Sequence, residues 1–259
     1  MKKIAVIGAG IAGVTTAYAL VKRGFRVTII DSRRYPAMAT SYANGGQLSA
    51  SNAETWNTPK NIASGLKWMF KADAPLLFNP SPNIQKYKWM FGFLTETLRG
   101  THKDNTLHTI ELAKRARDVY FTIADEENIE FDLLKKGILR FYDSQKEFKE
   151  DAEKKSWIEQ PGMEWEVMSP DEVVALEPSL TTANSKNKIV GGVYTKSDAS
   201  GDIHKFCVNL EKVLVEKYDV RVLTDTSVSN LSQRSHKLLF EYDDGKNLEI
   251  ISRGFRNPW

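Results

Sequence analysis

Hydrophobic and polar positions change their spacing twice within the first thirty residues. Residues 4–7 form a short apolar run, which is typical of a buried parallel strand. Behind it, apolar side chains recur at helical spacing at Val14, Ala17, Tyr18 and Val21. Residues 27–30 form a second apolar run that ends at Asp31. The pattern therefore predicts a strand, a turn, a helix and a second strand, as in α/β folds.

The next hundred residues lack this alternation. Residues 32–58 have no helical period and are rich in Ser, Thr, Asn, Ala and Gly, and a connection of this length is usually functional. Residues 59–128 are predicted to be helical, from the spacing of Leu66, Met69 and Phe70, of Tyr87, Met90 and Phe91, and of Leu107, Ile110 and Ala113. We expect Trp68, Trp89 and the nearby Met and Phe residues to lie in the core. A peripheral contact with a membrane stays open as the alternative.

The second half mixes short strands with helices. Residues 129–133 and 138–142 are predicted strands around the turn at 135–137. Ser169 and Glu172 have the spacing of a capping box, which predicts a helix start. Residues 203–217 form the last predicted helix. Further strands are expected at 189–194, 221–223, 228–231, 238–242 and 248–251, with a hairpin turn at 243–246.

Charge and composition exclude several classes of function. The 259 residues include 36 basic and 33 acidic side chains, a net charge of +3 that is too even to imply nucleic-acid binding. The single cysteine, Cys207, permits no internal disulfide and fits a reducing, cytoplasmic compartment. The four histidines do not cluster, so no metal site is predicted. The longest apolar run is too short to span a membrane.

The chemistry is concentrated in a glycine motif between the first strand and the first helix. Gly8 allows a tight turn, Gly10 lets the backbone approach a pyrophosphate, and Gly13 lets the helix pack close to the strand. The helix N-terminus then offers free N–H groups and a positive dipole end to phosphates. With Asp31 placed to accept hydrogen bonds from ribose hydroxyls, the motif predicts a bound dinucleotide. Asp31 would repel a 2′-phosphate and so disfavours NADP, an argument that the following Arg33 and Arg34 soften. The motif does not separate NAD from FAD.

A polar segment further along favours a flavin. Residues 40–49 read Thr-Ser-Tyr-Ala-Asn-Gly-Gly-Gln-Leu-Ser, and their hydroxyls, amides and glycines suit close backbone contact with a phosphate or a flat ring. On composition alone, a plain surface loop is an equal alternative. The long 32–58 connection also fits a flavoprotein better than an NAD-dependent dehydrogenase.

Several motifs together carry a family resemblance. They are the glycine motif, Asp31-Ser32-Arg33, the segment 41–47, Lys67-Trp68-Met69-Phe70, and Gly191-Gly192-Val193-Tyr194 followed by residues 198–202. In this combination the chain resembles the small-subunit type of bacterial D-amino acid dehydrogenases, within the glycine-oxidase and D-amino-acid-oxidase group of flavoproteins. The resemblance implies an α/β fold: a Rossmann-like FAD-binding domain, residues 1–58 and 195–259, interrupted by a mixed α/β substrate domain, residues 59–194.

The resemblance also implies which residues hold FAD. These are Gly8, Ala9, Gly10, Ile11, Ala12, Gly13, Asp31, Ser32, Ser41, Asn44, Gly45, Gly46, Gln47 and Val228. The implied reaction is the oxidative deamination of D-amino acids to 2-oxo acids and ammonia, with electrons passing to a quinone or another respiratory acceptor. A peripheral position on the inner face of the bacterial cytoplasmic membrane would suit that acceptor. No catalytic base is nominated, because the cofactor carries the chemical step, and we expect His204 and Cys207 to serve the helix surface and core.

The chain departs from the family pattern at its end. Related proteins are longer, and after residue 251 the polar and aromatic residues 252–259 do not match the expected strand. We therefore expect a C-terminally truncated, incomplete cofactor domain. Two alternatives stay open: a glycine or sarcosine oxidase-like enzyme that uses oxygen, and a fragment without catalytic activity.

Overall fold

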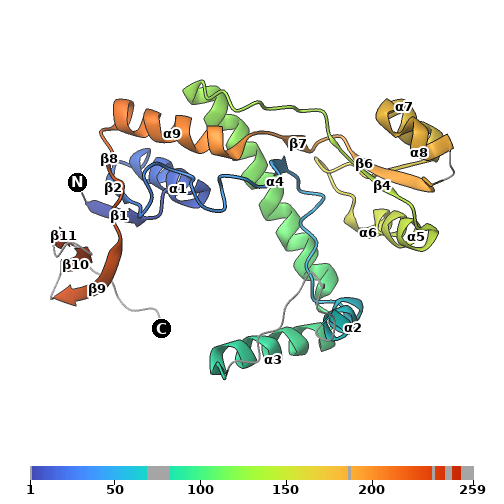
Figure 1. The fold of residues 1–259 in the computed structure, drawn as a ribbon, viewed down its shortest axis with the longest axis horizontal. Coiled ribbons are helices and arrows are strands. Elements are labelled where there is room, and N and C mark those ends of the chain that lie inside the picture. The colour runs from blue at the N-terminus through green and yellow to red at the C-terminus, as the bar shows by residue number, and fades with distance from the viewer. Residues whose placement is uncertain (1, 69–81, 186–187, 235–236, 243–246, 252–259) are drawn as a thin grey trace. The chain divides into compact units, whose positions relative to one another are not determined.

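The computed structural model describes residues 2–68, 82–185, 188–234, 237–242 and 247–251. The chain forms two compact units (Figure 1). The first unit comprises residues 1–47, 120–134 and 200–259, and the second comprises residues 48–119 and 135–199. Residues 48–58 and 195–199 thus belong to the second unit and 120–134 to the first, whereas the predicted division groups them the other way. The assignment of FAD to one part and substrate to the other stays a prediction.

The first unit begins with the predicted strand–helix–strand arrangement. Strand β1 (Lys3–Ile7), helix α1 (Ile11–Val21) and strand β2 (Arg26–Ile30) follow one another, and β8 (Arg221–Leu223) joins from the second half of the chain. All pairs are parallel, in the order β1-β2-β8, with Val6 opposite Ile29 and Ile29 opposite Val222. The apolar residues of β2 are buried because both faces of the strand are covered. Among the described strands β1 is the edge of this sheet, and its last residue, Ile7, is 57% exposed.

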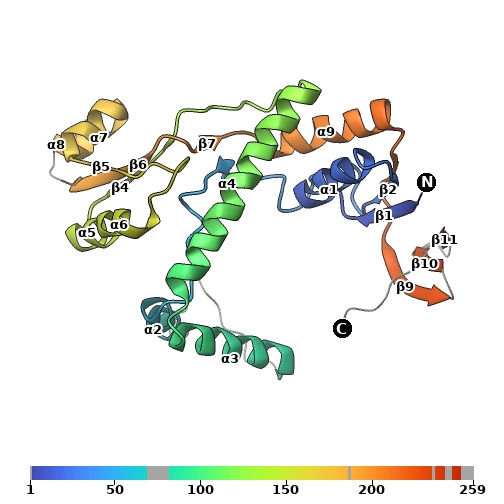
Figure 2. The same cartoon turned by 180° about the vertical axis from the view of Figure 1, so that it is seen from behind.

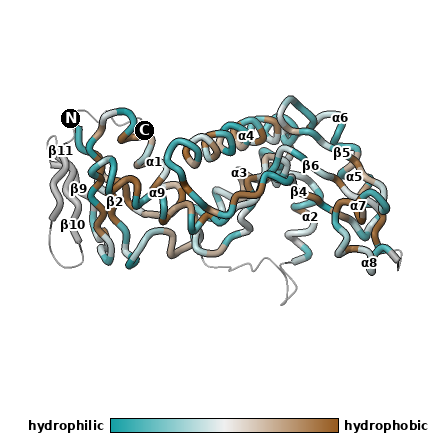
Figure 3. The backbone as a smooth tube through the Cα atoms, turned by 90° about the horizontal axis from the view of Figure 1, so that it is seen from above, coloured by the Kyte–Doolittle hydropathy of each residue, from teal (hydrophilic) through white to brown (hydrophobic). Residues whose placement is uncertain are grey.

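Helix α9 (Ile203–Tyr218) packs along α1, and the two lie side by side in both views of the ribbon (Figures 1 and 2). Asp202 caps its first turn by accepting a hydrogen bond from the Lys205 N–H at 2.9 Å. Its buried side chains recur at helical spacing, at Ile203, Phe206, Cys207, Leu210 and Leu214. Figure 3 shows hydrophobic and hydrophilic residues mixed along α9, as expected for a helix with one buried face. The predicted helix at 203–217 is confirmed.

Three antiparallel strands close the described chain: β9 (Val228–Arg234), β10 (Lys237–Tyr242) and β11 (Asn247–Ile251), in the order β11-β10-β9. Leu239 stands opposite Ser232 on one side and Glu249 on the other. The three predicted strands are confirmed. The predicted hairpin turn at 243–246 and the tail at 252–259 lie outside the described residues.

The predicted strand at 129–133 is wrong. Asn128 and Asp132 have positive φ angles of 52° and 54°, which interrupt an extended strand. Phe131 between them is buried against Phe206, with ring centroids 5.1 Å apart, and its carbonyl accepts a hydrogen bond from the Asp202 N–H at 2.7 Å. The segment's apolar residues reflect packing against the start of α9, not pairing in a sheet.

The second unit contains an antiparallel sheet with helices around it. Its strands, in the order β4-β6-β5, are β4 (Ile138–Tyr142), β6 (Gly191–Thr195) and β5 (Glu166–Met168). The helices of this part are α2 (Pro59–Trp68), α3 (Ile84–Leu98), α5 (Gln145–Glu153), α6 (Lys155–Ile158), α7 (Pro170–Leu176), the 3₁₀ turn η1 (Pro178–Leu180) and α8 (Thr181–Ser185). Helix α4 (His102–Glu127) begins in the second unit and ends in the first, and the two-residue strands β3 (Gln47–Leu48) and β7 (Ala199–Ser200) lie where the chain passes between units.

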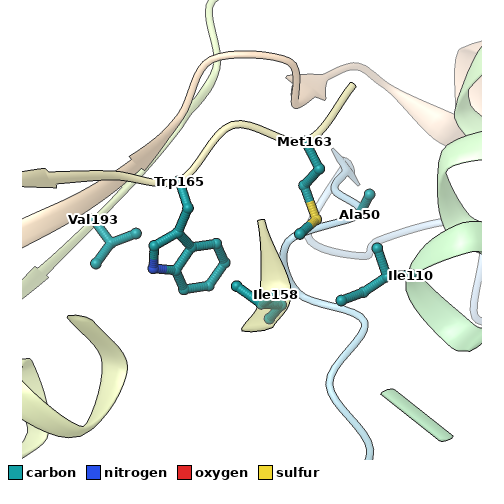
Figure 4. Packing of buried hydrophobic residues seen from close by; sticks show 6 residues of the cluster. All are labelled: Ala50, Ile110, Ile158, Met163, Trp165 and Val193. Carbon is teal, nitrogen blue, oxygen red and sulfur yellow. The ribbon is translucent and has the colours of Figure 1, made fainter. Parts of the chain in front are cut away.

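The predicted capping box is confirmed at the start of α7. The Ser169 hydroxyl accepts from the Glu172 N–H, and the Glu172 carboxylate accepts from the Ser169 N–H at 2.7 Å. A hydrophobic cluster forms part of the unit's core (Figure 4), where side chains from distant segments point toward one another. Its fully buried members are Ala50, Ile110, Ile158, Met163, Trp165 and Val193.

Helix α3 corrects another prediction. Its apolar residues are not in the core: Trp89 is 67% exposed, Phe91 68% and Leu98 77%. The indole of Trp89 stacks on Phe93 within the same helix, with ring centroids 5.5 Å apart. Trp68 at the end of α2 is 38% exposed, while Met69 and Phe70 lie outside the described residues. Helical spacing predicts a helix, but it does not reveal what covers the apolar side chains.

Candidate cofactor site

The turn between β1 and α1 has the geometry that its glycines predict. Gly8 has a φ angle of +100°, which side chains other than glycine rarely adopt, and its N–H donates to the Ile30 carbonyl at 2.7 Å. A Cβ added to Gly13 would lie 1.9 Å from the Gly8 carbonyl oxygen. The strand end and the helix start can therefore approach this closely only with glycine at position 13.

The N-terminus of α1 is built without a capping side chain of its own. Gly10 is the N-cap residue, in an extended conformation, and makes no side-chain cap hydrogen bond. The hydroxyl of Ser41, thirty residues later, accepts instead from the Ile11 N–H at 3.1 Å. A Cβ on Gly10 would lie 3.3 Å from the same Ser41 oxygen. The main chain at Gly10, which carries no side chain, therefore lies at the positive end of the α1 dipole. This arrangement is the one that binds a pyrophosphate.

Asp31 reaches this turn from the end of β2. Its carboxylate accepts from the Ala9 N–H at 2.6 Å and from the Arg33 N–H at 2.7 Å, one bond to each oxygen. An ionised carboxylate can accept about four hydrogen bonds, so each oxygen retains a lone pair for a ribose hydroxyl. The structure therefore brings together three parts of the predicted site: residues 8–13, Asp31 and Ser41. Ser32, which follows Asp31, is exposed.

The remaining predicted residues are placed separately. The Asn44 side-chain oxygen accepts from the Gly46 N–H at 2.7 Å, which forms a tight turn. Gly46 has a φ angle of +59°, and a Cβ there would lie 2.7 Å from the Gly201 carbonyl oxygen. Gly45 and Gln47 are exposed, and Val228 opens β9 opposite Tyr242. Within the described chain, no hydrogen bond joins residues 44–47 or Val228 to the turn at 8–13.

Two residues set aside as non-catalytic lie in α9. Cys207 is fully buried, and burial raises the pKa of its thiol to about 12, so it is a core residue and a poor nucleophile. The His204 ring lies edge-on to Tyr42, with ring centroids 5.0 Å apart, and also contacts Tyr35. In the part of the chain that the structure describes, no group of His, Cys, Asp and Glu side chains could hold a metal ion.

A buried ionic group in the second unit was missed by sequence reasoning. Asp198 is 1% exposed, and Arg117, from α4, donates to its carboxylate at 3.3 Å. Ser49, the last residue of the predicted flavin segment 40–49, and Ser51 also donate to it. Asp198 lies in the motif at 198–202 that carried the resemblance, but no sequence signal connects it to Arg117, 81 residues away.

The family model described as FAD dependent oxidoreductase matches residues 3–249. The chain belongs to this family. A D-amino acid dehydrogenase 3 from Mesorhizobium japonicum is 42% identical over 98% of the chain, and a D-amino acid dehydrogenase from Neisseria meningitidis is 33% identical over 83%. The chain spans 60% and 51% of the lengths of these two relatives.

Solved structures share the fold of this chain at low sequence identity. Glycine oxidase from Geobacillus kaustophilus is 16% identical, with a TM-score of 0.67, over 97% of this chain and 54% of that one. L-proline dehydrogenase from P. horikoshii is 17% identical, with a TM-score of 0.62, over 97% of this chain and 50% of that one. These likenesses confirm the predicted α/β fold of the FAD dependent oxidoreductase type.

The described residues fit the cofactor of this family. The positive φ of Gly8, the N-cap glycine at the start of α1 and the space that a side chain on Gly10 would fill form a cradle for a pyrophosphate. The carboxylate of Asp31, held by two backbone N–H groups, lies at the end of β2, where an adenosine ribose is bound in such folds.

Proposed function

We propose that the protein is an FAD-dependent enzyme that oxidatively deaminates D-amino acids to 2-oxo acids and ammonia. The observation that carries the proposal is the 42% identity to a D-amino acid dehydrogenase over almost the whole chain. The geometry of the turn at 8–13 supports it independently, because that turn suits a dinucleotide. The chain covers 60% of the length of that relative. The activity, the substrate and the partners of this chain are therefore proposed, by similarity to it.

In this proposal each part of the predicted site has a separate role. The residues from Gly8 to Gly13, with Ser41, hold the pyrophosphate at the start of α1, and Asp31 and Ser32 hold the adenosine ribose. Asn44, Gly45, Gly46 and Gln47 approach the pyrophosphate and the flavin. The main chain of Val228 contacts the adenine. The first unit thereby binds the cofactor, and the sheet of the second unit contributes to substrate binding.

Bound FAD supplies an acceptor for the hydride that leaves the α-carbon of the amino acid. Loss of that hydride and of one N–H proton converts the amine to an imino acid, which water hydrolyses to the 2-oxo acid and ammonia. The protein contributes position and exclusion of water, and no side chain needs to act as a base on a neutral amine.

We propose further that a quinone or another respiratory component accepts the electrons, from a protein on the cytoplasmic side of the membrane. No helix in the described ranges is long and apolar enough to cross a membrane. The exposed apolar side chains of α3, such as Trp89 and Phe91, support a peripheral contact. Co-sedimentation with quinone-containing phospholipid vesicles should weaken in Trp89→Ser with Phe91→Ser. Val119→Ser, which changes an exposed apolar residue of α4, is the control, and equal binding by all three proteins argues against the contact.

The proposed cofactor can be tested by the visible absorbance of the purified chain before and after FAD is added. We expect flavin bands at about one FAD per chain, and anaerobic bleaching on addition of D-alanine. Gly10→Val should lose the bands, because the new side chain fills the cradle beside Ser41. Undiminished FAD in this variant would overturn the assignment of the loop.

The same experiment separates the alternatives. Consumption of oxygen with release of peroxide would favour a glycine or sarcosine oxidase-like enzyme over transfer to a dye or quinone. Flavin bands that do not bleach with any amino acid would identify a cofactor-binding fragment without catalytic activity. Absence of flavin even with excess FAD would refute the proposed function for this chain.

A further inference from the structure

Asp198 is the centre of a buried hydrogen-bond cluster in the second unit. Its carboxylate accepts from the Ser49 hydroxyl at 2.7 Å, the Ser51 hydroxyl at 2.6 Å and the Ala50 N–H at 3.0 Å. The Ser51 N–H lies 3.4 Å from the same carboxylate. Two main-chain groups and two hydroxyls of one three-residue segment thus converge on a side chain almost 150 residues later.

The cluster includes a paired charge. Arg117 donates one guanidinium N–H to Asp198 at 3.3 Å and another to the Gly162 carbonyl at 3.1 Å. The side chains of Arg117 and Asp198 are 7% and 0% exposed. A buried carboxylate of this kind is tolerated when it is paired and fully hydrogen-bonded, whereas loss of one partner leaves an uncompensated charge. Asp198 can therefore not be replaced by a neutral residue without disturbing its donors.

The main chain of Asp198 is itself fixed. Its N–H donates to the Thr195 carbonyl at 3.2 Å, and its carbonyl accepts from the Gly137 N–H at 3.0 Å. Thr195 ends β6, the middle strand of the sheet in this unit, and is fully buried. Asp198 is thus a rigid attachment point at the end of the sheet.

Residues 49–51 need such an attachment because they have no regular structure to satisfy their backbone. Ala50 is fully buried and Ser51 is 2% exposed, so their N–H groups are removed from water. Buried N–H groups that find no acceptor cost free energy, and here Asp198 is the acceptor of both. Ser49 follows Gln47, the last residue of the segment that is predicted to contact FAD, by two positions.

We propose that Asp198, kept paired by Arg117, is a positioning residue for the flavin segment. By holding Ser49, Ala50 and Ser51, it fixes the C-terminal end of residues 44–47 and limits the conformations that the segment samples before FAD binds. The segment then loses less conformational entropy on binding. The inference rests on the proposed function in one respect, namely that residues 44–47 contact FAD.

The test compares two neutralised carboxylates of the second unit. Asp198→Asn removes the acceptor for the 49–51 segment, and Asp151→Asn changes another buried carboxylate, whose partners are Tyr142, Lys154 and Arg140. We expect both variants to lower the thermal midpoint of the chain. Only Asp198→Asn should weaken FAD binding, by about ten-fold, and change the shape of the bound-flavin absorbance. Asp198→Glu keeps the charge and should recover part of the affinity.

Amide hydrogen exchange of the cofactor-free chain gives a readout that does not depend on FAD. Asp198→Asn should accelerate exchange at Ala50 and Ser51, and Asp151→Asn should not. If Asp198→Asn does not fold, Ser49→Ala with Ser51→Ala removes two donors and leaves the ion pair with Arg117, and the same direction of change is expected.

Two results would overturn the inference: unchanged exchange at Ala50 and Ser51, or an FAD affinity of Asp198→Asn within about two-fold of the unaltered chain despite a lower thermal midpoint. If the unaltered chain binds no FAD, the proposed function fails instead. The exchange measurement then still decides whether Asp198 holds the segment.

Discussion

The turn at residues 8–13 and the cluster around Asp198 are both ordered, but they are built in opposite ways. The turn consists of neighbouring residues, and its glycines matter because they have no side chain. At Gly13, for example, a side chain would collide with the Gly8 carbonyl. The cluster gathers Ser49, Ser51 and Arg117 on one carboxylate across as many as 149 residues of sequence. In the turn, steric exclusion selects the residue type, whereas in the cluster hydrogen bonding and charge pairing select it.

The difference determines how each region should respond to substitution. A side chain added at Gly13 meets backbone atoms of Gly8, which cannot move aside without shifting a strand or a helix. A side chain removed from the cluster leaves buried donors and the Arg117 charge without their acceptor, so the cost there comes from lost hydrogen bonds and charge pairing.

Gly13→Ala should be the most damaging of these changes. Its Cβ would lie 1.9 Å from the Gly8 carbonyl oxygen, so β1 and α1 must separate. We expect the free energy of unfolding to fall by about 3 kcal/mol or more, the upper range for overpacking. Denaturant unfolding followed by circular dichroism measures the change.

The matched control is Gly65→Ala in α2, where an added Cβ meets nothing within 4 Å. It should stabilise the helix by about 0.5–1 kcal/mol, because alanine restricts the unfolded chain. Similar stabilities of the two variants would mean that Gly13 is not a contact point between strand and helix.

Asp31→Ala tests the polar side of the same turn. The variant loses the acceptor of the Ala9 and Arg33 N–H groups and the proposed acceptor of the ribose hydroxyls. FAD binding should weaken by roughly 1–3 kcal/mol, measured by titration of flavin fluorescence. Asp125→Ala, at an exposed carboxylate of α4 in the first unit, should leave the affinity unchanged. Equal affinities of the two variants would remove Asp31 from the cofactor site.

Tyr218→Phe tests a dispersed cluster in the first unit. Tyr218 donates to Glu127 at 2.6 Å, and Tyr18 and Lys217 donate to the same buried carboxylate. Burial acts to raise the pKa of Glu127, but these hydrogen bonds outweigh it and lower the pKa below its ordinary value of 4.5. Removing one donor of a cluster that keeps the others should cost about 1 kcal/mol at neutral pH.

The pH dependence of this variant follows from the lowered pKa. A carboxylate with a depressed pKa contributes stability above its unfolded-state pKa, and the contribution is lost as the pH falls through the folded-state value. The difference between Tyr218→Phe and the unaltered chain should therefore shrink as the pH falls below 4.5. Tyr194→Phe, which loses a hydrogen bond to the Lys136 carbonyl, should show no such change, because a carbonyl does not titrate. A constant difference for both variants would contradict the charged state of Glu127.

The sequence predicted helices and strands well where neighbouring residues determine the secondary structure. The strand–helix–strand unit, the helix at 203–217 and the Ser169 capping box are confirmed. The strand at 129–133 was wrong because positive φ angles at Asn128 and Asp132 leave no trace in hydrophobic spacing. The placement of Trp89 in the core was wrong because helical spacing does not specify a neighbour.

The candidate site divides in the same way. Residues 8–13 and Asp31 could be predicted because each acts within a short motif whose geometry is set by glycine and by the end of a strand. The hydrogen bond between Ser41 and the Ile11 N–H could not be derived from spacing, because thirty residues of irregular chain separate them. The structure confirms the local geometry of the turn, and the cofactor roles of all these residues, as of residues 44–47 and Val228, stay predictions.

By itself the sequence determined the dinucleotide turn, most strands and helices, and the family, because these depend on neighbouring residues and on motifs of fixed spacing. Only the tertiary structure decided which buried charges meet, with Arg117 on Asp198 in one unit and Lys217 on Glu127 in the other. The physical reason is that a buried ion pair depends on the distance between its charges in space and on the removal of water. Neither can be derived from the order of residues along the chain.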